Sequence, residues 1–131
     1  MSHPVLQRFE RAKKYDPKGF NCIGAAYYLV GLDPVEQYRE PGHLEMQEPR
    51  LRRVSNLDEA QMIGIEVWGG SGHIGHLAVI HPEKRGTIIE RSDAGKEITE
   101  EPIDTIFWVD GNTRKYRSVL FSVDGMSKGQ A

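Results

Sequence analysis

The stretch that decides how this chain folds runs from residue 20 to residue 31 and reads Phe20-Asn21-Cys22-Ile23-Gly24-Ala25-Ala26-Tyr27-Tyr28-Leu29-Val30-Gly31. A break at residues 16–19 precedes an apolar stripe that ends at Gly31, which predicts a helix from Cys22 to about Val30. A thiol in the first turn of a helix faces unpaired N–H groups and the positive end of the helix dipole, both of which favour the thiolate. The thiolate is the nucleophilic form of cysteine, so this position suits covalent catalysis; the competing interpretation is a small buried core residue.

Length and charge narrow the class of protein. The 131 residues predict one domain, residues 1–131, with a helix and lead-in over 1–19 and a flexible tail over 124–131. A net charge of −2 gives no broad basic field, so we expect no nucleic-acid partner. The single cysteine allows no internal disulfide, and nothing in the sequence calls for a cofactor.

The sequence also bears on localisation. The N-terminal residues contain no long apolar run, so no secretory signal is visible, and no stretch approaches the length of a membrane-spanning helix. We therefore expect no membrane insertion. The chain is expected to be cytoplasmic as synthesised, or to be exported by a route that the sequence does not show.

The order of patterns predicts the fold class. Helical patterns cover residues 4–14, capped by Ser2, then 22–30 and, briefly, 33–38, whereas residues 41–55, with the basic Arg50, Arg52 and Arg53, suggest a polar surface loop or lid. Strand patterns follow at 63–68, 76–81, 87–90, 105–109 and 116–121. This order predicts an α+β fold with N-terminal helices packed on a C-terminal antiparallel sheet.

A catalytic cysteine needs a histidine to move its proton. His3 lies near the N-terminus and His43 in a polar loop, so neither is a good candidate. His76 opens a strand directly after a glycine, which leaves room for a helix start and a substrate. Because side chains alternate along a strand, His76 and His81 point to opposite faces and cannot both meet Cys22.

The group that orients the imidazole is expected on the neighbouring strand. If the turn after the His76 strand contains an odd number of residues, Glu90 lies opposite Ala78 and on the same face as His76. An even turn would place Arg91 opposite His76 instead, and the sequence does not decide between them. Asp93, in the next turn, is the alternative orienting group.

These residues carry a resemblance to a known superfamily. Asn21-Cys22-Ile23-Gly24 at a helix start resembles the Asp-Cys-Ser-Gly motif of the NlpC-type papain-like peptidases. Gly75-His76-Leu77-Ala78-Val79-Ile80, followed by Gly86-Thr87-Ile88-Ile89-Glu90, resembles the histidine hairpin of the CHAP branch, the cysteine- and histidine-dependent amidohydrolases and peptidases. The resemblance spans roughly residues 15–110.

The resemblance implies a papain-like core and hydrolysis of an amide or isopeptide bond through a thioester. By position, Cys22 would be the nucleophile, His76 the general base and acid, and Glu90 the orienting residue. The N–H of Cys22 would supply part of an oxyanion hole. The implied substrate is a peptide or a cell-wall muropeptide. Three biological roles are compatible with this activity: an injected toxin, a phage lysis enzyme and an intracellular hydrolase. If the protein is an injected toxin, an immunity or inhibitor protein would be its partner.

Two other interpretations stay open from the sequence. In the first, the chain is a non-catalytic interaction domain in which Cys22 is structural and the loop at Arg50–Arg53 binds a partner protein. In the second, His73, His76 and His81 hold a metal ion, although these positions fall on a loop and on both faces of one strand and do not converge.

Overall fold

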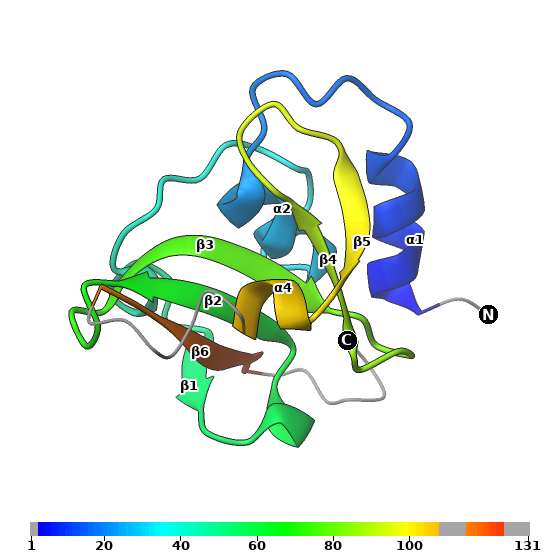
Figure 1. Cartoon of the computed structure of the whole chain (residues 1–131). Coiled ribbons are helices and arrows are strands. Elements are labelled where there is room, and N and C mark those ends of the chain that lie inside the picture. The colour runs from blue at the N-terminus through cyan, green and yellow to red at the C-terminus, as the bar shows by residue number, and fades with distance from the viewer. Residues whose placement is uncertain (1–2, 108–114, 125–131) are drawn as a thin grey trace.

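The computed structural model describes residues 3–107 and 115–124 and confirms the α+β class. Within these residues, a six-stranded antiparallel sheet has the order β1-β6-β2-β3-β4-β5, and α1 and α2 lie over one of its faces (Figure 1). The helices are α1 (Pro4–Ala12), α2 (Cys22–Leu29), α3 (Leu44–Gln47) and α4 (Asp104–Phe107), with one 3-10 turn, η1 (Leu57–Glu59). The strands are β1 (Leu51–Val54), β2 (Met62–Val67), β3 (His73–Ile80), β4 (Thr87–Arg91), β5 (Ile98–Pro102) and β6 (Tyr116–Val123).

The helix predicted over residues 4–14 is present but shorter, and α1 ends at Ala12. Its buried side chains, Val5, Phe9 and Ala12, follow the predicted apolar face. The ring nitrogen Nδ1 of His3 accepts a hydrogen bond from Val5 N–H, so His3 is the residue that caps the helix. Ser2, the predicted cap, lies outside the described residues.

Helix α2 forms the centre of the molecule. All eight of its residues are buried, and it packs against α1, β3 and β4. Gly31, with φ of 84°, ends it in the left-handed conformation that glycine adopts without strain. The larger core lies between these helices and one face of the sheet, which includes Leu77 and Val79, while Ala78 and Ile80 pack on the opposite face with α4.

The brief helix predicted over residues 33–38 is absent, and the ion pairs of its two carboxylates explain the difference. Asp33 binds the guanidinium of Arg39 through two hydrogen bonds of 2.8 and 2.9 Å. Glu36 binds Arg91 of β4 at 2.6 and 2.9 Å, and both side chains are only 1% exposed. These carboxylates therefore tie an irregular segment to the rest of the fold instead of starting a helix.

Two other predicted elements were wrong. Residues 41–55 are not a continuous surface loop or lid, because they contain α3 and β1, and β1 pairs with β6 from Leu51 to Val54. The strand predicted at 105–109 begins instead as α4, in which Ile106 packs under the sheet beside Ile103, a helical spacing of three. The acidic edge strand β5 was not predicted, since an exposed edge carries no strong apolar alternation.

The predicted tail at 124–131 lies outside the described residues except for Asp124, whose N–H donates to Arg50 O. Among the described helices, none is long and apolar enough to cross a membrane.

Candidate active site

Cys22 is the first residue of α2, and Asn21 fixes the geometry of this helix start. The Asn21 side-chain oxygen accepts from Gly24 N–H at 3.1 Å, which satisfies one of the N–H groups of the first turn. The N–H groups of Cys22 and Ile23 have no hydrogen-bond partner among the described residues. Two free donors therefore lie beside the Cys22 thiol, where an oxyanion would need them.

A β-bulge directs His76. Ile65 of β2 pairs with His76, but the next residue, Glu66, pairs with Ile74, so Gly75 is an extra residue in β3. A Cβ on Gly75 would lie 2.7 Å from a methyl group of Val67, so the close packing here requires glycine. Beyond the bulge, Leu77 points into the core under α2 and His76 points to the opposite face.

Glu90 contacts His76 just beyond the paired part of the β3–β4 hairpin. In the pairing of β3 with β4, Val79 lies opposite Ile89 and Ile80 opposite Ile88, so the connection between the strands contains an odd number of residues. This register puts Glu90 opposite Ala78 and on the face of His76. The Nε2 atom of His76 lies 2.5 Å from Oε1 of Glu90, and both side chains are largely buried, at 17% and 9% exposed.

The electrostatics of the site tie Cys22 to the same imidazole. Burial by itself lowers the pKa of His76, but the hydrogen bonds and charges of Cys22 and Glu90 outweigh burial and raise that pKa to about 9. The Cys22 side chain therefore favours the protonated form of this ring, as Glu90 does. Since Nε2 faces Glu90, Nδ1 is the nitrogen that remains for the thiol. The imidazole of His76 thus interacts with both of the other predicted site residues, and we call Cys22, His76 and Glu90 together the Cys22–His76–Glu90 line.

One wall of the site is a segment that the sequence did not point to, residues 39–42. Asn21 holds its start, donating to Arg39 O at 2.7 Å and accepting from Arg39 N–H at 3.2 Å. Gly42 holds its end, exchanging backbone hydrogen bonds of 2.8 and 3.1 Å with Ile74 of β3. The segment therefore spans from the residue before Cys22 to the strand that carries His76. The one sequence feature that could have indicated this wall is Asn21. Asparagine is a strong helix cap whose side chain has hydrogen-bonding capacity beyond the cap itself.

The remaining candidate residues lie away from this line. Asp93 is exposed, and its carboxylate accepts from the N–H of Ala94 in its own turn. His81 is buried, and its Nδ1 accepts from the N–H groups of Glu83 and Lys84. Within residues 3–107 and 115–124, no group of three or more His, Cys, Asp or Glu side chains is placed to hold a metal ion.

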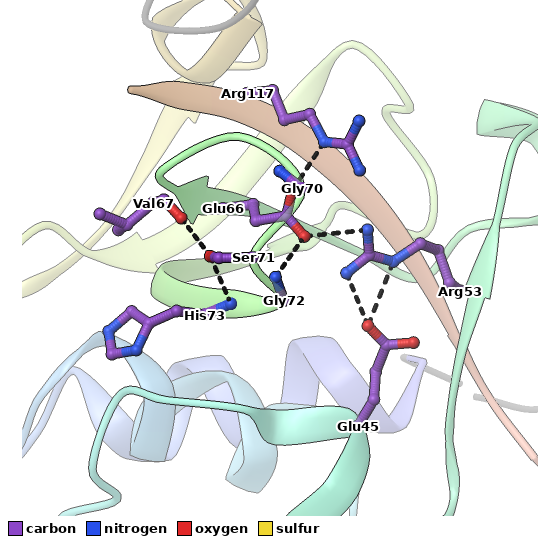
Figure 2. A network of polar contacts seen from close by, with 9 residues as sticks. All are labelled: Glu45, Arg53, Glu66, Val67, Gly70, Ser71, Gly72, His73 and Arg117. Carbon is purple, nitrogen blue, oxygen red and sulfur yellow. Dashed lines mark hydrogen bonds and ion pairs between the residues drawn. The ribbon is translucent and has the colours of Figure 1, made fainter. Parts of the chain in front are cut away.

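Two of the basic residues of the predicted partner-binding loop, Arg50 and Arg53, form ion pairs within the protein. Arg53 binds Glu45 of α3 at 2.6 Å and Glu66 of β2 at 3.1 Å (Figure 2). Arg50 binds Glu48 at 2.7 Å. Glu66 is 1% exposed and also accepts from Arg117 and from the glycine loop at residues 69–72. No local pattern indicates this cluster, because its charged members come from three separate strands and from α3.

No protein-family model matches the chain, and no curated protein matches it. What the protein does must therefore follow from the chemistry of these side chains.

Proposed function

We propose that this chain is a thiol hydrolase with a papain-like core that cleaves an amide or isopeptide bond through a cysteine thioester. The observation that carries the proposal is the line from Cys22 through His76 to Glu90. It joins a helix-start thiol, an imidazole and a carboxylate, the three groups that thiol hydrolysis needs.

Each residue has a step in this reaction. The Cys22 thiolate attacks the carbonyl carbon, and the charge that develops on oxygen lies near the N–H groups of Cys22 and Ile23. The His76 imidazolium gives its proton to the leaving amine as the C–N bond breaks, which leaves a thioester on sulfur. Neutral His76 then takes a proton from water, whose oxygen attacks the thioester, and the acid product departs as the thiolate returns. Glu90 holds the ring and stabilises the imidazolium throughout.

The proposed substrate is a peptide, an isopeptide or a cell-wall muropeptide. If the chain acts as an injected toxin, a protein inhibitor or immunity partner belongs to the same proposal. The chemistry of the three side chains is common to all of these substrates, because each presents the same scissile amide.

The experiment that tests the proposal is alkylation of Cys22 by iodoacetamide, followed by intact mass spectrometry at pH 6 and pH 9. Cys22 is the only cysteine, so one added mass identifies the site. An ordinary thiol with a pKa of about 8.5 gains on the order of 10²-fold in rate across this range, because only the thiolate reacts. We expect a nearly flat profile for the wild type and the steep profile for His76→Ala. Comparing two pH values within each variant removes the effect of burial on access. A wild-type profile as steep as that of an ordinary thiol would rule the mechanism out.

A further inference from the structure

The bulge at Gly75 also orients His73. On β2, Val67 and Ile65 lie on one face of the sheet, and they pair with His73 and His76 respectively. His73 and His76 therefore share a face although they are three residues apart, a spacing that would put them on opposite faces of a regular strand. Because Gly75 is the extra residue, the two positions lie only two residues of β2 apart, a rise of about 7 Å.

Next to His73 lies an exposed tryptophan in an unusual backbone conformation. Trp68 is 63% exposed and has φ of 56°, the only positive φ among the described residues other than glycine. Its ring centroid lies 5.4 Å from that of His73, whose ring lies 5.8 Å from that of His43. We call the rings of Trp68, His73 and His43 the aromatic ledge.

A buried carboxylate holds the loop that carries Trp68. Glu66 accepts from Gly70 N–H at 2.5 Å and from Gly72 N–H at 3.0 Å, while Ser71 donates to Val67 O and accepts from His73 N–H (Figure 2). The Trp68 N–H also donates to Lys115 O. Left-handed backbone at a bulky residue persists only where the surroundings fix it, and such residues concentrate at ligand contacts.

The polar groups of this loop indicate what the ledge can bind. Glu66, Arg53 and Ser71 are all engaged within the protein, and Figure 2 shows the His73 ring directed away from the Glu66 carboxylate. Recognition of a sugar would need free polar side chains around the stacking ring to pair with its hydroxyl groups. The loop instead presents the faces and edges of aromatic rings, which pack favourably against another aromatic ring.

We propose that the aromatic ledge is a specificity subsite that takes an aromatic side chain of the substrate, about three residues from the scissile bond. The spacing rests on the proposed function, because it is measured along β3 from His76. An extended peptide advances about 3.3 Å per residue, so a chain running beside β3 from the reacting carbonyl brings its third side chain, two residues beyond the first, to the ledge.

Peptide probes that react with Cys22 at a defined position test this directly. The thiolate displaces chloride from N-acetyl-Phe-Ala-Gly chloromethyl ketone, forming a thioether and placing Phe three residues from the sulfur on the acyl side. Chloroacetyl-Ala-Ala-Phe amide does the same on the leaving-group side. Each probe is compared with its partner in which Ala replaces Phe, by the second-order rate of labelling. We expect the Phe probe to react about 3- to 10-fold faster in one of the two series.

Two variants isolate the ring from the loop. Trp68→Gly accepts the positive φ without strain, so it keeps the loop and removes the ring. We expect it to melt no lower than the wild type, to react equally with iodoacetamide and to lose the preference for Phe, whereas Trp68→Phe retains part of it. Equal rates for Phe and Ala probes in both series of the wild type would overturn the subsite while leaving the thiol chemistry standing.

A binding measurement decides the matter if the thiol proves inert. N-acetylphenylalanine amide at millimolar concentration should shift the NMR signal of the Trp68 indole N–H in a saturable way, whereas N-acetylalanine amide should not. Trp68→Phe assigns that signal. An unmoved signal, or an equal shift with N-acetylglucosamine, would overturn the proposal.

Discussion

The ring nitrogen Nε2 of His76 lies 2.5 Å from the carboxylate oxygen Oε1 of Glu90, across the point at which β3 and β4 are no longer paired. The thiol of Cys22, the first residue of α2, acts on the same imidazole and contributes to its raised pKa. The site thus depends on strand register as much as on the helix start.

Substituting the thiol separates chemistry from folding. Cys22→Ala should abolish hydrolysis of a fluorogenic peptide library, because no other group in the line forms a thioester. It should change the free energy of unfolding by no more than about 1–2 kcal/mol, since it removes one small atom from the core. Denaturant unfolding of both proteins measures the second quantity. Equal hydrolysis by the variant and the wild type would contradict the mechanism.

The roles of His76 and Glu90 predict different reductions in turnover rate when each residue is substituted. His76→Ala removes the proton carrier and should slow turnover by on the order of 10²- to 10⁴-fold. Glu90→Gln should cost less, because the amide oxygen can still accept the hydrogen bond from Nε2–H and hold the ring. The turnover rates of the two variants on one peptide substrate give the comparison. If Glu90→Gln matches the wild type, Asp93 should be substituted next; if neither change has an effect, the line has no third member.

The raised pKa of His76 predicts a titration that NMR can follow. The signal of the ring Cε1–H should move with a midpoint of about 9, and Cys22→Ala should lower that midpoint because one source of the increase is removed. A pKa raised on folding adds stability that is complete below about 6.5, the unfolded value, and is lost as the pH rises through about 9. The melting-temperature advantage of the wild type over His76→Gln should therefore shrink between pH 6.5 and pH 9. A midpoint near 6.5 in the wild type would mean that neither partner stabilises the imidazolium.

Local signals made part of the site predictable. The position of Cys22 followed from the break at residues 16–19 and from Gly31, which ends α2. Alternation along the strand separated His76 from His81. The partner of His76 depended on whether the turn after β3 was odd or even. No local pattern settles that number, and the structure has the odd register that brings Glu90 to the ring.

Contacts between residues distant in the sequence explain the features that were not predicted correctly. Arg53 and Glu66 are separated by thirteen positions and look like solvated charges in the sequence, yet they meet inside the fold. Residues 105–107 favour a strand by composition, but burial of Ile103 and Ile106 on one side selects the helix α4. Tertiary contacts overrode local preference in both places.

Gly24 lies where another segment crosses the helix start. A Cβ at this position would lie 1.8 Å from the backbone oxygen of Gln37, and a backbone atom cannot move aside as a flexible side chain can. Gly24→Ala should therefore displace the segment at 37–42 or the first turn of α2, with a loss of about 1–3 kcal/mol in stability and a slower alkylation of Cys22 at pH 6. Gly86→Ala is the matched control, because a Cβ there meets nothing within 4 Å. Equal behaviour of the two variants would show that the crossing does not shape the site.

The buried pair of Glu36 and Arg91 ties the segment that leads into the wall at residues 39–42 to β4. Both side chains are 1% exposed, and Tyr15 also donates to Glu36 at 2.7 Å. Glu36→Ala leaves the Arg91 guanidinium buried without its carboxylate, so we expect a loss of about 3–5 kcal/mol in urea unfolding. Glu10→Ala, which removes an exposed pair with Lys13, should change stability by less than about 1 kcal/mol.

A double substitution separates the pair's own contribution from the cost of an unpaired charge. Glu36→Leu with Arg91→Met fills the same space with apolar groups and should recover much of the loss, since well-packed apolar side chains can replace a buried ion pair. Because Glu36 lies in the segment that leads to Arg39, the single variant should also weaken the hold on residues 39–42 and slow alkylation of Cys22, and the double variant should slow it less. A single variant as stable as Glu10→Ala would show that the tether contributes nothing to the fold.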